Sequence, residues 1–128
     1  MDEKDCSSLT LAYLGDALYE VFIRERVIAQ GKSPKVDVLH KDGVRYVNAK
    51  AQASAIKEMI GEGFLSEEET AIAKRARNHR TATKAKNADP VDYKWATALE
   101  ALIGWLKLTN QDKRMTEVME RAAQLTER

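Results

Sequence analysis

Residues 9–28 read LTLAYLGDALYEVFIRERVI, and this stretch decides the fold. Its apolar residues recur at three- and four-residue intervals, which place them on one face of an α-helix. They are Leu11, Leu14, Leu18, Val21 and Phe22. The longer apolar segments further along the chain keep this spacing, and none alternates as a strand would. We therefore predict an all-α protein, a single compact helical domain over residues 1–128.

Local signals in the first half of the chain predict two further helices. Ser33-Pro34 is typical of a helix cap followed by proline at the first helical position, and predicts a short helix that ends near Lys41. Asp42-Gly43 then interrupts the pattern, and residues 44–60 form the next periodic segment.

In the second half, Ser66 and Glu69 stand at the spacing of a capping box, which starts a helix. Periodicity disappears over residues 78–88, which predicts a polar loop. An Asp-Pro pair at 89–90 starts a helix that continues to about residue 108. We expect Asn110 to cap a last amphipathic helix.

The composition describes a globular protein, with 44% apolar and 32% charged residues. No apolar run approaches the roughly 18–20 residues of a membrane span. Residues 1–5 are mostly acidic and lack the order of a secretory signal. Cys6 is the only cysteine, which excludes an internal disulfide and a cysteine-rich zinc site. We expect a reduced, cytoplasmic setting without a membrane partner.

Basic residues are concentrated in one stretch, although the net charge is only +1. The candidates for contact with a nucleic acid there are Lys74, Arg75, Arg77, Asn78, His79, Arg80, Lys84 and Lys86. No acid lies among them, and no aromatic ring is available to stack on bases. The stretch therefore favours contact with the backbone of a duplex, although a charge run is also typical of a solvated loop.

Two acids interrupt apolar helical segments. Asp16 lies within residues 9–28, and Glu100 is the only acid between Trp95 and Leu108. Buried carboxylates need a cation, a metal ion or hydrogen-bond donors, and two that converge suit Mg²⁺. Two structural alternatives stay open at this point: Asp16 caps a helix that begins after it, or Glu100 pairs with an arginine across the bundle.

The segment Leu14-Gly15-Asp16, within residues 11–20, resembles the signature helix of ribonuclease III catalytic domains. Residues 100–104, Glu-Ala-Leu-Ile-Gly, are similar to the second motif of that family. Residues 74–78 and 39–41 resemble the Mini-ribonuclease III branch in particular. The resemblance covers nearly the whole chain, and it implies an all-α domain that forms a symmetric homodimer around a duplex.

The resemblance implies that Asp16 and Glu100 are the catalytic acids and bind Mg²⁺, for which Mn²⁺ can substitute. Glu20 is either an auxiliary metal ligand or a structural pairing residue. His40 and Lys41 join the candidates for RNA contact. Two other family acids are absent, because Ala12 and Thr97 occupy their positions. This departure leaves the number of bound ions open.

The implied activity is endonucleolytic cleavage of double-stranded RNA that leaves 5′-phosphate and 3′-hydroxyl ends, in maturation of the large-subunit (23S) ribosomal RNA precursor. A ribosomal-protein helper is a further expected partner. The chain has no room for a separate RNA-binding domain, so the basic stretch is expected to replace one. The alternative is a non-catalytic helical RNA-binding or ribosome-assembly factor. A nucleotide pyrophosphohydrolase would need paired acidic helix motifs, which the sequence does not contain.

Overall fold

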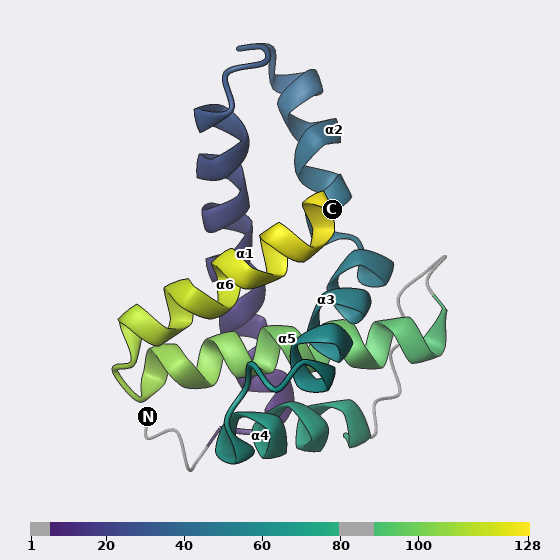
Figure 1. Cartoon of the computed structure of the whole chain (residues 1–128), viewed down its shortest axis with the longest axis vertical. Helices are drawn as coiled ribbons and strands as arrows, with labels where there is room; N and C mark the ends of the chain where they lie inside the picture. The colour runs from purple at the N-terminus through teal and green to yellow at the C-terminus, as the bar shows by residue number, and fades with distance from the viewer. Residues whose placement is uncertain (1–5, 80–88) are drawn as a thin grey trace.

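The computed structural model describes residues 6–79 and 89–128, and these residues form six α-helices without a strand (Figure 1). The helices are α1 (Ser8–Ala29), α2 (Val36–Val47), α3 (Ala49–Gly61), α4 (Glu67–Asn78), α5 (Pro90–Leu108) and α6 (Asp112–Glu127). The all-α prediction is confirmed. None of these helices is both long and apolar enough to cross a membrane.

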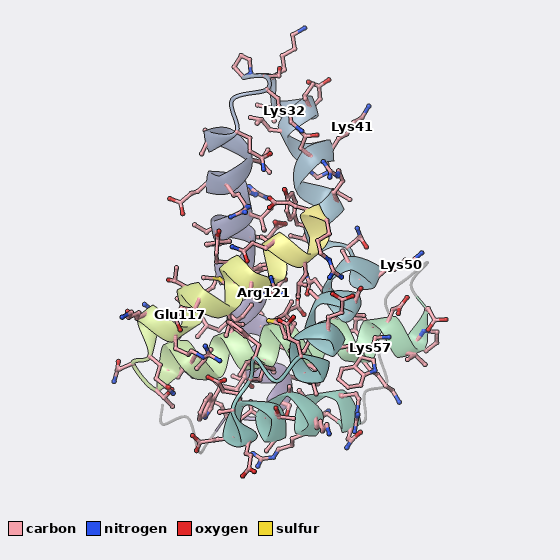
Figure 2. All side chains as sticks on the ribbon, in the orientation of Figure 1. Lys32, Lys41, Lys50, Lys57, Glu117 and Arg121 are labelled. Carbon is pink, nitrogen blue, oxygen red and sulfur yellow. The ribbon has the colours of Figure 1, made fainter. Side chains whose placement is uncertain are left out.

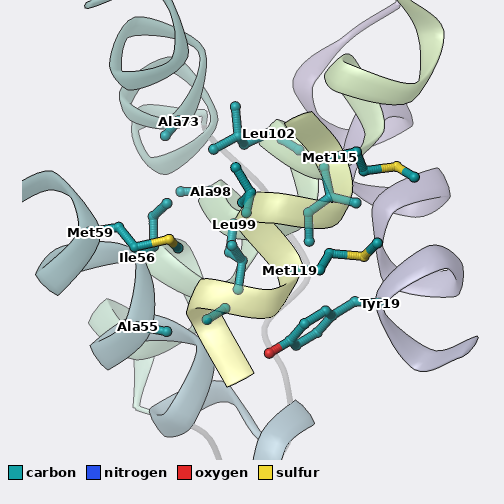
Figure 3. Packing of buried hydrophobic residues seen from close by; sticks show 14 of the residues in the cluster. Tyr19, Ala55, Ile56, Met59, Ala73, Ala98, Leu99, Leu102, Met115 and Met119 are labelled. Atoms are coloured by element: carbon teal, nitrogen blue, oxygen red, sulfur yellow. The ribbon is translucent and has the colours of Figure 1, made fainter. Parts of the chain in front are cut away.

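Helix α5 is the centre of the bundle, and α1, α3 and α4 pack around it (Figure 1). Its residues 96–99 and 101–106 are buried, so nearly every face of the helix meets protein. Figure 3 shows Leu99 and Leu102 of α5 between Met59 of α3 and Met119 of α6. A helix that is apolar all round belongs in a core, and this one carries Glu100 into it.

Helix α1 packs against α5 through its N-terminal part, and its C-terminal part forms a hairpin with α2 that projects from the rest of the molecule (Figure 1). The last turn of α1 is tied to the end of α6 through Arg26. The Arg26 guanidinium donates to Glu120 at 2.5 Å and to Glu127 at 2.7 Å. The Tyr46 hydroxyl of α2 donates to Glu127 at 2.7 Å as well. One acid at the end of α6 therefore holds both helices of the hairpin.

The capping box at the start of α4 is confirmed. The Ser66 hydroxyl accepts from the Glu69 backbone N–H at 3.1 Å, and the Glu69 carboxylate accepts from the Ser66 N–H at 2.9 Å. The buried Glu69 carboxylate also receives two hydrogen bonds from Arg114 of α6, at 2.8 and 2.9 Å. The cap predicted from local sequence thus doubles as a link between two helices.

Three predicted boundaries are wrong. Helix α2 begins after Lys35 rather than at Ser33-Pro34, and it runs through Gly43 to Val47. The break falls instead at Asn48, whose side chain accepts from the Ala51 N–H at 2.9 Å and donates to the Val44 carbonyl at 2.9 Å. Near the end, Asn110 adopts a left-handed backbone with φ of 60°, and Gln111 precedes α6.

Candidate active site

Helices α1 and α5 are in direct backbone contact at two glycines. Gly15 lies so close to Glu100 that an added Cβ would be 1.7 Å from the Glu100 carbonyl oxygen. Gly104 lies against Leu11 in the same way, at 2.0 Å from its carbonyl oxygen. Neither position has space for a side chain. The contact brings Asp16, which follows Gly15, next to Glu100.

Asp16 and Glu100 form an acidic pair at this crossing. Asp16 is exposed and Glu100 is half-buried. The pKa of Glu100 is raised to about 8, first by burial and then by the negative charge of Asp16 and a hydrogen bond between the two carboxyl groups. A carboxyl group whose pKa is raised by burial beside a second carboxyl group forms a site where a cation would replace its proton.

Both structural alternatives for these acids are wrong. Helix α1 begins at Ser8 with Ser7 as its cap, so Asp16 lies in the helix interior and caps nothing. Within residues 6–79 and 89–128, Glu100 has no ion pair with an arginine or a lysine. The described residues therefore explain the pair neither by helix capping nor by a salt bridge across the bundle.

Gln52 of α3 is a third side chain at the pair, and the sequence reasoning missed it. It is 3% exposed, its amide nitrogen donates to the Val47 carbonyl at 2.9 Å, and a hydrogen bond from it lowers the pKa of Glu100. Its amide oxygen is buried and has no partner in the described part of the chain. A signal for it exists in the sequence, because Gln52 is an isolated amide between Ala51 and Ala53 on a helix with a buried face.

Glu20 lies one helical turn beyond Asp16, and its negative charge also raises the pKa of Glu100. Its carboxylate is 3.9 Å from the Arg24 guanidinium, so a pairing partner is present. No group of three His, Cys, Asp or Glu residues close enough to hold a metal ion occurs in the described ranges. The acidic donor set there is the pair, with Glu20 at its edge.

The donor set at the crossing suits a hard divalent cation. Mg²⁺ binds through oxygen, commonly with one or two protein carboxylates, and fills its other positions with water and phosphate oxygens. Asp16 supplies an exposed carboxylate, Glu100 a half-buried one, and Gln52 a buried amide oxygen to which no described residue donates. Cysteine and histidine, which softer metals prefer, are absent from this set.

The basic candidates divide between the end of α4 and residues outside the described ranges. Lys74 and Arg75 are exposed on α4. The Arg77 guanidinium lies 4.7 Å from the centre of the Trp95 ring of α5 and donates to Asn78 at 3.0 Å. His79 follows α4 directly, and its Nδ1 is buried without a partner among the described residues. Residues Arg80, Lys84 and Lys86 lie outside the described residues.

His40 and Lys41 lie on α2, at the opposite end of the molecule from α4 (Figure 1). Lys41 points away from the body of the protein (Figure 2). His40 lines a cavity of about 230 Å³ between α1 and α2, together with Glu20. The structure therefore separates these two residues from the basic end of α4.

The hairpin of α1 and α2 also carries exposed apolar side chains. Tyr13 is 84% exposed and Val36 is 79% exposed, and Val21 and Ile28 are more than half exposed. The rest of the cavity between the two helices is lined mainly by aliphatic residues, including Val44. Large exposed apolar groups in this number along α1 and at the start of α2 are typical of a protein–protein contact.

Comparisons with known proteins agree with this fold. Residues 9–111 match the family model described as "Ribonuclease III domain". The Mini-ribonuclease 3 of Enterococcus faecalis is 45% identical over 92% of this chain and 89% of that protein, and that of Clostridium tetani is 44% identical over 98% and 82%. A crystal structure of a Fusobacterium nucleatum protein superposes with a TM-score of 0.79 at 35% identity, over 91% of each chain.

Proposed function

The chain belongs to the ribonuclease III family, as an endoribonuclease of the Mini-ribonuclease 3 group, and from this premise we propose that it cleaves double-stranded RNA at the Asp16–Glu100 pair. The observation that supports the proposal is the crossing of α1 and α5. It places carboxylates from two distant segments side by side without a neutralising arginine or lysine among the described residues.

In this proposal Asp16 and Glu100 hold Mg²⁺, with Mn²⁺ as a substitute. The ion supplies Lewis-acid stabilisation of the charge that develops on the phosphodiester. Glu100 loses its proton when the ion binds, since burial and the neighbouring carboxylate keep it protonated otherwise. Asp16 is exposed, so its carboxylate is open to solvent and substrate. The products carry 5′-phosphate and 3′-hydroxyl ends.

Contact with the duplex is assigned to the exposed basic end of α4. Lys74 and Arg75 reach solvent there, and the stacking of Arg77 on Trp95 holds a guanidinium at the junction of α4 and α5. Basic side chains that offer no aromatic ring for base stacking bind the phosphate backbone and recognise the A-form shape of the duplex. Asn78 and His79 complete this proposed surface. Arg80, Lys84 and Lys86, which lie outside the described residues, are proposed to contact RNA as well, while His40 and Lys41 would contact RNA separately.

We also propose that the protein is a homodimer joined through the projecting hairpin. The support is the exposed apolar surface of α1 and α2, which includes Tyr13 and Val36. Val36→Asp should turn the dimer into a monomer in sedimentation, because a carboxylate would be buried in the interface. Val91, which is 58% exposed on α5, offers the control, and Val91→Asp should leave the mass unchanged.

The proposed substrate is the precursor of large-subunit (23S) ribosomal RNA in the cytoplasm, with a ribosomal protein as a helper. The Mini-ribonuclease 3 relatives support an RNA target. Mapping the cut ends in that precursor, with and without ribosomal proteins, tests the substrate and the helper together. Cleavage of a generic duplex with equal efficiency and no preferred position would contradict this assignment.

The central experiment is incubation of long duplex RNA with the protein, with and without Mg²⁺. We expect cleavage only with the ion, and none by Asp16→Asn, which keeps the size of the side chain but removes its charge. Asp112→Asn is the matched control, since Asp112 is an exposed acid whose partner is Lys107, away from the pair. Duplex binding without cleavage by the wild type would favour a non-catalytic RNA-binding factor instead.

A further inference from the structure

The amide of Gln52 has a defined orientation at the acidic pair. Its nitrogen donates to the Val47 carbonyl at 2.9 Å, and a carbonyl can only accept, so the nitrogen must face Val47. The Gln52 side chain also lies close enough to Glu100 to lower the pKa of that carboxyl group. The amide oxygen shares a carbon atom with this nitrogen and therefore lies in the neighbourhood of the Glu100 carboxylate.

That oxygen is unusual in the described structure. Gln52 is 3% exposed, and its Oε1 has no hydrogen-bond partner among the described residues. A buried acceptor without a partner is destabilising, and native proteins keep one where water, an ion or a functional role accounts for it. A bound ion, or a water molecule on that ion, would be the missing partner of this oxygen. Amide oxygens are ordinary ligands and hydrogen-bond acceptors around hard divalent cations.

We propose that Gln52 is a positioning residue of the ion site, which fixes the Glu100 carboxylate through its amide nitrogen and offers its amide oxygen to the ion or to one of the ion's waters. This inference rests on the proposed function. It explains how a site with only two acids at its centre gains a further oxygen, and it links α3 to the crossing of α1 and α5. Groups that orient metal ligands commonly change metal affinity by about 10–100-fold when removed.

A purely structural role for Gln52 predicts a different result. Its bond to Val47 lies at the junction of α2 and α3, so removal of the amide would loosen that junction. Asn48 stabilises the same junction through its bonds to Val44 and Ala51, and both of these bonds lie away from the acidic pair. Asn48→Ala therefore supplies a matched variant that weakens the junction and leaves the site intact.

The test measures Mn²⁺ binding by titration calorimetry, without RNA, on the wild type and the variants well below their melting temperatures. We expect Gln52→Met to weaken Mn²⁺ affinity by about tenfold or more. Asn48→Ala should lower the melting temperature and leave the affinity unchanged. If Gln52→Met does not fold, Gln52→Asn replaces it, because it keeps an amide but withdraws it from Glu100, and the same loss of affinity is expected.

Wild-type affinity in a folded Gln52→Met or Gln52→Asn variant would overturn this inference and leave the proposed function standing. An equal loss of affinity in Asn48→Ala would also overturn it, since the effect would then belong to the junction. Failure of the wild-type protein to bind Mn²⁺ at all would instead overturn the ion site itself. The three results are therefore distinguishable in one series of titrations.

Discussion

Replacement of Gly15 by alanine tests the crossing on which the site depends. The added Cβ would lie 1.7 Å from the Glu100 carbonyl oxygen, whereas ordinary contact begins at 3.4 Å, so α1 and α5 must separate by about 1.7 Å. Overpacking commonly costs about 1–3 kcal/mol where side chains can move aside. Here the obstacle is backbone, so we expect a loss of about 3 kcal/mol. For a chain of this length, that corresponds to a drop of about 11 °C in melting temperature.

The measurement is urea unfolding and thermal melting of Gly15→Ala beside the wild type. Gly61→Ala is the control, because an added Cβ at Gly61 meets nothing within 4 Å. It should change the free energy of unfolding by less than about 1 kcal/mol, and not unfavourably. RNA cleavage by Gly15→Ala should also fall, since separated helices carry Asp16 away from Glu100. A Gly15→Ala protein within about 1 kcal/mol of the wild type would refute the backbone contact.

Three further predictions concern charge. The raised pKa of Glu100 means that the folded protein holds its proton more tightly than the unfolded chain, so stability in EDTA should fall as the pH rises from the ordinary glutamate range to about 8. Glu100→Gln should remove that slope in urea titrations, and an unchanged slope would contradict the assignment. Arg114→Met leaves the buried glutamate at the start of α4 unpaired and should cost about 3 kcal/mol above about pH 6, measured by chemical unfolding; a loss below about 1 kcal/mol would show that the pair is not stabilising. Replacing Arg75, Arg77 and Arg80 together by glutamine should reduce the salt dependence of RNA binding by about 0.9 in log–log slope for each phosphate that is no longer neutralised, whereas an equal slope would mean that the stretch is only solvated.

Sequence is sufficient where local chemistry decides the structure. The capping box of Ser66 and Glu69 and the Asp-Pro start of α5 depend on neighbouring residues alone, and the structure contains both as predicted. The helix break predicted at Asp42-Gly43 is a different case, because local chemistry does not decide it. A glycine inside a helix costs only about 1 kcal/mol, and α2 continues through Gly43, where an added Cβ would point toward Ile23 of α1. The end of α2 is then determined by Asn48, which caps the next helix.

The candidate site could be predicted only in part from the sequence, for the same reason. Asp16 and Glu100 stand out because each interrupts an apolar helical segment, and the sequence alone shows that contrast. The contribution of Gln52 depends on how α3 packs on α5, and the only signal in the sequence is an isolated amide between two alanines. The expected burial is also wrong for one acid. Asp16 is exposed although its helix is largely apolar and its neighbour Gly15 is in contact with α5.

The hydrogen bonds that Glu127 accepts from Arg26 and Tyr46 have a consequence for local unfolding. Because the Glu127 carboxylate accepts hydrogen bonds from both α1 and α2, fraying of the last turn of α6 removes a contact of each helix at the same moment. Backbone amides near Arg26, Tyr46 and Glu127 should therefore exchange with deuterium at a shared rate, as one cooperative unit. If two subunits associate through α1 and α2, amide exchange should also slow in the last turn of α6, which lies outside that contact and at the C-terminal end of the sequence.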